Sequence, residues 1–250
     1  MLKISIITVV FNGETHLEET IKSVLSQTYP AIEYLIIDGK SRDATVDIIK
    51  KYNEKIAFWV SEADKGLYDA MNKGLEAATG DFVWFINAGD TIYKNDTVET
   101  IILHYKENTD ILFGEVMIVD GNRNELGTRS ARTAQKLPET LTWQSLRYGM
   151  VVSHQGILVR RSIAPSYLLD NLTADIDWVI VALKRARHIV NTHTILATFQ
   201  TGGISTQRKR QSLRDRFWVF SRHFGLLNTL FAHIYIGLRG VVGVFRTQQE

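Results

Sequence analysis

Three aspartates stand out in the first part of the chain because each comes shortly after a run of mostly apolar residues. They are Asp38, Asp64 and Asp90, and polar side chains lie near them in the sequence: Asn12, Ser41, Lys65 and Asn87. Carboxylates at the rim of a cleft can accept hydrogen bonds from a nucleobase or ribose, or can bind a hard divalent cation. Aspartate and asparagine are also common in turns and helix caps, which remains the alternative for each residue taken alone.

Two periodicities alternate along the same part of the chain and predict how these side chains are brought together. Short apolar runs predict strands at 4–10, 32–37, 57–60 and 82–86, and apolar residues at helical spacing predict helices at 17–25, 43–52 and 68–78. This alternation indicates an α/β fold with a mostly parallel, twisted sheet flanked by helices on both faces. Ligands bind such sheets beyond the carboxyl ends of the strands, where the three aspartates lie.

The pattern weakens after residue 95. We predict strands at 111–119, 156–159 and 188–199, and helices at 97–105 and 177–186. The polar stretch 122–135 is expected to form a surface loop or lid. This half of the chain should build the far edge of the sheet and a second wall over the cleft.

Composition excludes several classes of protein. The chain has 250 residues, 22% charged and 45% hydrophobic, as in a folded globular protein. The absence of cysteine excludes disulfides, thiol nucleophiles and Cys-ligated metal sites. We expect no signal peptide at the N-terminus. We also expect no transmembrane helix, because charged residues and histidines interrupt the most apolar region, 217–245.

The net charge of +2 conceals an asymmetry. From Arg208 to Glu250 there are eight Lys/Arg against two acids, a balance of +6, so the first 207 residues carry −4. We therefore expect an acidic body, 1–206, and a basic, amphipathic helical tail, 207–250.

Five ordered stretches in the first half resemble the family 2 glycosyltransferases, which bind nucleotide sugars with the fold called GT-A. The stretches are 5–13, 23–29, 36–43, 61–74 and 80–90. The resemblance is tight over residues 3–92 and looser to about residue 206, and it is greatest to bacterial enzymes of surface-polysaccharide (colanic-acid-type) assembly. It implies a nucleotide-binding half, 1–95, and an acceptor-side half, 96–206.

The resemblance also implies roles for individual residues. Those assigned to the nucleotide and donor sugar are Thr8, Val10, Asn12, Asp38, Ser41, Asp64, Lys65, Asn72, Asn87 and Ala88. Asp90 matches the last aspartate of the family's DxD metal signature, whose first aspartate is replaced here by Asn87. We expect Mn²⁺ or Mg²⁺ to arrive with the nucleotide, because one carboxylate and one amide oxygen hold a cation weakly by themselves. A metal-independent enzyme, or one that has lost activity, is the alternative.

Asp175 is the candidate general base, in a stretch that resembles the family's acidic motif before the acceptor-side helix. Asp177 is the reserve candidate. Transfer with inversion needs one carboxylate to take the proton of the attacking hydroxyl; the alternative role for Asp175 is a helix N-cap. His154 is expected either to line the substrate pocket or to be a structural histidine.

Two further segments have open interpretations. The stretch 199–206 resembles a loop of polysaccharide-assembling enzymes, and we expect it near the diphosphate with Arg208 or Lys209; an ordinary turn after a strand is the alternative. The basic, aromatic-rich tail suits an anionic membrane surface through 208–246. It could equally pack on the body or on a second subunit. We do not expect it to bind nucleic acid, because no recognition motif accompanies the charge.

The expected function is therefore that of an inverting glycosyltransferase. It would move a sugar from a nucleotide diphosphate, UDP in our interpretation, to a saccharide hydroxyl on a lipid-linked acceptor in surface-polysaccharide synthesis. We expect it in the cytoplasm, peripherally attached to the plasma membrane. The alternatives are a nucleotide-sugar-binding protein without turnover and a nucleotidyltransferase.

Overall fold

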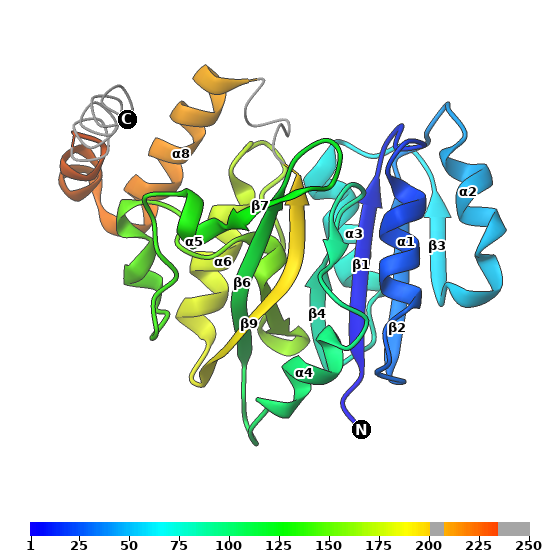
Figure 1. The fold of residues 1–250 in the computed structure, drawn as a ribbon. Coiled ribbons are helices and arrows are strands. Elements are labelled where there is room, and N and C mark those ends of the chain that lie inside the picture. Colours follow the sequence, from blue (N-terminus) through cyan, green and yellow to red (C-terminus); the bar gives the residue numbers. More distant parts are fainter. Residues whose placement is uncertain (201–207, 235–250) are drawn as a thin grey trace.

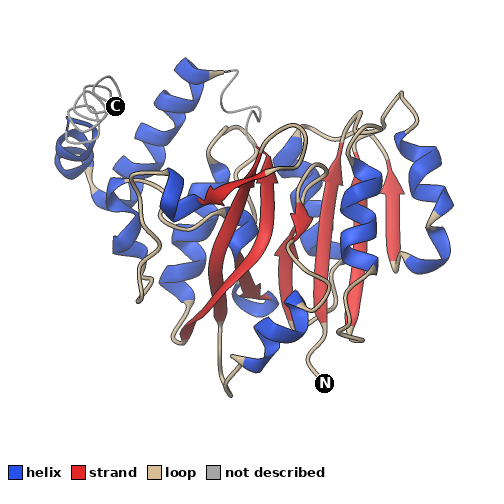
Figure 2. Ribbon diagram, in the orientation of Figure 1, coloured by secondary structure: helices blue, strands red, loops and turns tan. Residues whose placement is uncertain are grey.

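A central sheet covered by helices on both faces forms the body of the protein (Figures 1 and 2). The computed structural model describes residues 1–200 and 208–234. The first half alternates strands and helices in the order β1 (Ile4–Val10), α1 (Leu17–Leu25), β2 (Ile32–Asp38), α2 (Thr45–Lys51), β3 (Phe58–Ser61), α3 (Leu67–Ala77) and β4 (Phe82–Phe85). All residues of β1 and β4 are buried, as expected of strands covered on both faces.

The second half contributes the remaining elements. They are β5 (Thr91–Ile92), α4 (Thr97–Leu103), β6 (Ile111–Val119), β7 (Glu125–Thr128), α5 (Arg129–Arg132), β8 (Ile157–Arg160), α6 (Ala174–Arg185), β9 (Ile189–Gln200) and α8 (Lys209–Phe224). Short 3₁₀ turns cover Asn53–Lys55, Trp143–Tyr148, His154–Gly156 and Arg161–Ile163. The predicted polar stretch 122–135 thus contains a strand and a short helix, whose start is capped by the Thr128 hydroxyl.

The strand order is β3-β2-β1-β4-β8-β6-β9-β5, with β7 paired to β6. The strands β3, β2, β1 and β4 are parallel throughout, which confirms the fold class predicted from the alternating pattern. In the second half β8 runs antiparallel to β4 and β6, whereas β6 and β9 are parallel. The end of β9 pairs with β5, which follows β4 in the chain. This pairing brings the last residues of β9 to the carboxyl end of β4.

Alternate side chains of β1 enter two hydrophobic clusters. Ile7 and Val9 belong to a cluster shared with α3, α6 and α8, whereas Ile4 and Ile6 belong to one shared with α1, α2 and α4. Burial of one large aliphatic side chain contributes about 1.5–3 kcal/mol, so packing of both clusters fixes the sheet between its helices. Because α8 contributes to the first cluster, the start of the basic tail is packed on the body, which was one of the predicted alternatives.

The helix predicted at 177–186 begins earlier, at Ala174. Asp175 and Asp177 therefore lie in its first turn instead of preceding it, where their negative charge interacts favourably with the helix dipole. The predicted loop 201–206 and the tail beyond residue 234 lie outside the described residues. Within the described part of the chain, no helix is both long and apolar enough to span a bilayer.

Candidate active site

Asp38 ties together the ends of three strands. Its carboxylate accepts the main-chain N–H of Ser41 at 3.0 Å and the Ser61 hydroxyl at 2.6 Å, and the Ser41 hydroxyl also donates to it. Ser41 Oγ accepts the main-chain N–H of Asn12 at 2.7 Å, which links the end of β1. We call the joined carboxyl ends of these strands the rim. Asp38 is completely buried, so it lies beneath the surface of the rim. In this structure its carboxylate is bonded to Ser41 and Ser61, and the role of Asp38 in holding a nucleoside stays a prediction.

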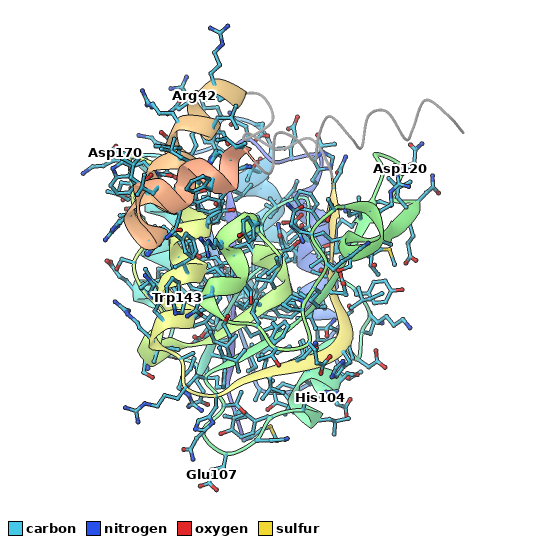
Figure 3. All side chains as sticks on the ribbon, turned by 90° about the vertical axis from the view of Figure 1, so that its left-hand side faces the viewer. Arg42, His104, Glu107, Asp120, Trp143 and Asp170 are labelled. Carbon is cyan, nitrogen blue, oxygen red and sulfur yellow. The ribbon has the colours of Figure 1, made fainter. Side chains whose placement is uncertain are left out.

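Asn12 forms the exposed part of this rim. Its φ of 49° lies in the left-handed region, which asparagine tolerates better than most residues. Its Oδ1 accepts the main-chain N–H of Arg42 at 2.9 Å. Figure 3 shows Arg42 at the upper end of the molecule, at the opposite end from Glu107. Val10 is buried, and its carbonyl accepts the N–H of Gly39 at 2.9 Å, so Val10 shapes the rim through its main chain.

Asp64 lies directly over Gly39. A Cβ atom placed on Gly39 would be 2.5 Å from Asp64 Oδ2, so the missing side chain creates the space that this carboxylate occupies. The other oxygen, Oδ1, accepts the main-chain N–H of Gly66 at 2.9 Å. Asp64 is partly exposed, and Lys65 beside it is exposed. Asp64 is therefore the carboxylate of the rim that a ligand can reach.

The turn after β4 places two oxygen-bearing side chains at the neighbouring strand end. The Ala88 N–H donates to the Val9 carbonyl at 3.3 Å, which joins this turn to β1. Asp90 is buried, accepts the Gln155 amide at 2.7 Å, and is hydrogen-bonded by the main chain of Gln200. Burial raises the pKa of Asp90 to about 7, against the opposing effects of the Gln155 hydrogen bond and the Arg123 charge.

The side chains of Asn87 and Asp90 fit a divalent cation that is shared with a ligand. Asn87 Oδ1 is buried and has no hydrogen-bond partner among the described residues, so it is an orphaned acceptor. Carboxylate and amide oxygens are the donors that Mg²⁺ and Mn²⁺ prefer. The described residues contain no group of three or more Asp, Glu or His side chains that could hold a metal.

Asp175 lies in the first turn of α6, where it meets α3. Its Oδ1 is 3.4 Å from the hydroxyl of Tyr68, which follows Asp64 by four residues at the start of α3. Burial raises the pKa of Asp175, and the Ile176 N–H, Tyr68 and the Arg216 charge oppose that shift. A carboxylate with a raised pKa is a stronger base, and this is what proton abstraction from a hydroxyl requires.

Asp177 has a structural role instead. Its Oδ1 lies 2.7 Å from His223 Nε2 and 3.4 Å from Arg222 Nη1, both on α8. The Asp177 and His223 side chains are each only 6% exposed. Asp177 therefore fixes the tail helix to α6, and its buried, paired carboxylate is not available as the reserve base.

His154 is also structural. Its Nε2 lies 2.6 Å from the Tyr167 hydroxyl, and its ring packs against Phe85 and Trp178. Burial lowers its pKa to about 4, so the ring is neutral near pH 7. This arrangement corresponds to the structural alternative for His154.

Two other predicted donor-site residues turn away from the rim. Thr8 is fully buried, and its hydroxyl donates to the Ile86 carbonyl at 2.7 Å, so it joins β1 to the end of β4. The Asn72 amide binds both main-chain groups of Tyr167, donating to the carbonyl at 3.0 Å and accepting the N–H at 2.7 Å. These bonds hold the segment before α6 against α3. Neither side chain is placed to bind a nucleotide directly.

Sequence patterns missed several residues that organise the site. The most important are Gly39, Ser61, Tyr68, Gln155 and Arg216. Gln155 directly follows His154, which was a predicted site residue, so a local signal lay next to it. The contribution of Arg216 depends on how α8 folds back on α6, and no local pattern encodes that.

Comparison with known proteins identifies the family. The sequence profile described as Glycosyl transferase family 2 matches residues 5–168. The chain belongs to this family. It is 42% identical over 213 residues to an uncharacterized glycosyltransferase of Mycobacterium tuberculosis, covering 82% of this chain and 78% of the relative. A PGL/p-HBAD biosynthesis glycosyltransferase of Mycobacterium bovis is 27% identical over 212 residues, covering 80% of this chain and 78% of the relative.

Solved structures of glycosyltransferases share the fold. Staphylococcus aureus TarS 1–349 in complex with UDP-GlcNAc superimposes with a TM-score of 0.64 at 20% identity, over 81% of this chain and 59% of that one. The mannosyltransferase PcManGT of Pyrobaculum calidifontis, in complex with GDP-Man and Mn²⁺, has a TM-score of 0.65 at 15% identity, over 99% and 79%. The family 2 chain is thus a glycosyltransferase with a GT-A-type fold, as the sequence resemblance implied.

Proposed function

We propose that this glycosyltransferase transfers a sugar from a UDP-linked donor, with inversion at C1, to a hydroxyl of a lipid-linked saccharide in surface-polysaccharide assembly. The proposal is carried by one observation: Asp64 over Gly39 and the Asn87–Asp90 turn lie on joined strand ends. A nucleotide bound at this rim would place its base against the Asp64 carboxylate. Its diphosphate would lie near the side-chain oxygens of Asn87 and Asp90. The carboxylate favours uracil over cytosine, because the ring N–H of uracil can donate to it and cytosine has no such ring N–H. The cytoplasm is the compartment we propose.

We include one Mg²⁺ or Mn²⁺ ion in the active complex. Asn87 Oδ1 and the Asp90 carboxylate would hold it together with oxygens of the diphosphate. The ion supplies positive charge next to the leaving diphosphate. The Mn²⁺ in the PcManGT complex supports this assignment.

In the proposed reaction Asp175 accepts the proton of the acceptor hydroxyl. The acceptor oxygen forms a bond to C1 of the donor sugar as the bond between C1 and the diphosphate oxygen breaks, and UDP leaves with that electron pair. One displacement inverts the configuration at C1. The raised pKa of Asp175 makes this proton transfer more favourable.

A hollow of about 410 Å³ supports an acceptor site on the segment that leads into α6. Trp218 of α8 is half-exposed on one side of it, and Asp170, Asn171 and Arg214 supply polar groups. An apolar surface with a few polar groups suits a saccharide. Figure 3 shows Asp170 at the same end of the molecule as Arg42, which belongs to the nucleotide rim.

The substitution Asp175→Asn tests the proposal against the binding-protein alternative. Transfer is followed as labelled sugar passing from a panel of UDP-sugars to a bacterial lipid extract. We expect the wild-type chain to transfer, and D175N to lose about 10²–10⁴-fold in rate while UDP affinity stays unchanged. Asp47→Asn, at an exposed site on α2, is the matched control and should behave as wild type. Nucleotide binding without transfer by the wild type would favour the alternative, and release of a sugar phosphate would favour a nucleotidyltransferase.

A further inference from the structure

The last described helix, 226–234, exposes its large apolar residues and buries its small ones. Thr229 and Ala232 are each 1% exposed, whereas five large residues are 44–71% exposed: Leu226, Leu227, Leu230, Phe231 and Ile234. Spacings of four residues place these five side chains on one face of the helix, which we call the exposed stripe. Figure 1 shows this helix, in red, beyond α8 on the side away from the sheet.

The helix that carries the exposed stripe is fixed to the body. The His233 ring packs against Phe217 and Phe220 of α8, with centroid distances of 5.2 and 5.9 Å. Asn228 Oδ1 accepts a hydrogen bond from Arg147 Nη2 at 2.6 Å. The polar side of the helix is therefore used for packing and the apolar side is turned outward, the reverse of an ordinary surface helix.

Positive charge precedes the exposed stripe in the sequence, between residues 208 and 222. Residues 208–234 contain six Lys/Arg and one acid, Asp215. Asp215 is buried, accepts the Leu172 N–H at 3.0 Å and lies 3.5 Å from Arg214 Nε, so it offsets part of the charge of that one arginine. Four arginines of this segment are exposed: Arg208, Arg210, Arg214 and Arg222.

We propose that residues 208–234 dock the enzyme on an anionic lipid surface, with the exposed stripe inserted at the level of the headgroups. The positive charge of this segment distinguishes the two candidate partners of the exposed stripe, which are a second copy of the chain and a lipid surface. A second copy of the chain related by two-fold symmetry would oppose one basic patch to another, whereas anionic headgroups complement it. An apolar helical face combined with basic residues is the pattern of helices that lie in a membrane interface. Docking does not depend on the identity of the donor or acceptor.

Vesicle sedimentation with the full chain tests this proposal. The probes are vesicles of phosphatidylcholine alone and of phosphatidylcholine with 30% phosphatidylglycerol, and the variants are L227E/F231E and R210Q/R214Q. The matched control is Leu103→Glu, because Leu103 is 80% exposed on α4, next to His104 at the far end of the molecule (Figure 3). Thermal unfolding and sedimentation velocity, measured on each variant, report folding and oligomeric state.

We expect the wild type and L103E to bind the anionic vesicles and to leave neutral ones largely unbound. L227E/F231E should bind at least about tenfold more weakly with unchanged thermal unfolding, and R210Q/R214Q should bind several-fold more weakly. The proposal is overturned if the wild type binds neither vesicle, or if L227E/F231E binds as the wild type does. A wild-type dimer that L227E/F231E converts to a monomer, without vesicle binding, would instead identify the occupant as a second copy.

Discussion

The hydroxyl oxygen of Tyr68 lies 3.4 Å from Asp175 Oδ1 and 3.1 Å from the carbonyl oxygen of Leu172. Tyr68 follows Asp64 at the start of α3, and Leu172 precedes the first turn of α6. This phenol therefore couples the nucleotide rim to the candidate base. It acts as a positioning residue, since it orients Asp175 and stabilises its charged form.

The variant Tyr68→Phe should shift the pH profile of transfer. Asp175 must be deprotonated to accept a proton, and the Tyr68 hydrogen bond lowers its pKa against the effect of burial. Removing the hydroxyl therefore raises the pKa of Asp175 further, and the acidic limb of the rate profile moves to higher pH. The measurement is the transfer rate between pH 5 and 9. An unshifted acidic limb would show that the two groups are not coupled.

The variant Gly39→Ala should weaken nucleotide binding without destabilising the fold. The added methyl group would meet Asp64 Oδ2 at 2.5 Å, so the carboxylate must move. We expect about a tenfold loss in UDP affinity, the size of one lost hydrogen bond to a charged group. Gly121→Ala is the control, because the nearest atom to its Cβ would be 3.9 Å away. Equal UDP affinity in G39A and G121A would contradict a ligand contact at Asp64.

The variant Asp177→Ala should loosen α8 from the body. It removes the acceptor of a buried hydrogen bond from His223, at a cost of roughly 1–3 kcal/mol in the free energy of unfolding. The exposed pair of Asp47 with Lys50, at 3.7 Å, provides the control: Asp47→Ala should cost less than about 0.5 kcal/mol. Chemical denaturation measures both. Matching stabilities would mean that the Asp177 contact does not anchor the tail.

The raised pKa of Asp90 predicts that the stability of the metal-free protein depends on pH. Its pKa is about 7 when folded and near 3.8 when unfolded, so the folded state binds more protons between these values. The contribution of Asp90 to the free energy of unfolding therefore falls as pH rises from about 4 to 7. Asp90→Asn, which resembles the protonated form, should remove this contribution. Denaturation at several pH values compares the two proteins, and identical pH slopes would contradict a buried, titrating Asp90.

The parallel half of the sheet was predictable because its signals are local. The strands β1 and β4 are buried on both faces, and each polar residue after a strand marks the edge where ligands bind. The aspartates at strand ends were therefore found from the sequence, and the structure joins their strand ends into one rim.

The different roles of the individual aspartates were not predictable from the sequence, because long-range contacts determine these roles. Asp38 and Asp64 look equivalent in the sequence. In the structure, the buried Asp38 is hydrogen-bonded to Ser41 and Ser61. Asp64 stays accessible to a ligand because Gly39 beneath it has no side chain. Asp175 and Asp177 differ only by which face of α6 meets α8. Helical periodicity alone places neither next to Tyr68 or His223.

The most direct test of the account is calorimetric titration of UDP, GDP and dTDP with and without Mn²⁺. The account predicts that the wild type binds UDP best and that Mn²⁺ strengthens binding about tenfold or more. Asn87→Ala and Asp90→Asn should retain metal-free binding but lose the gain from Mn²⁺. If none of the three nucleotides binds under either condition, the strand-end rim is not a nucleotide site and the account is wrong.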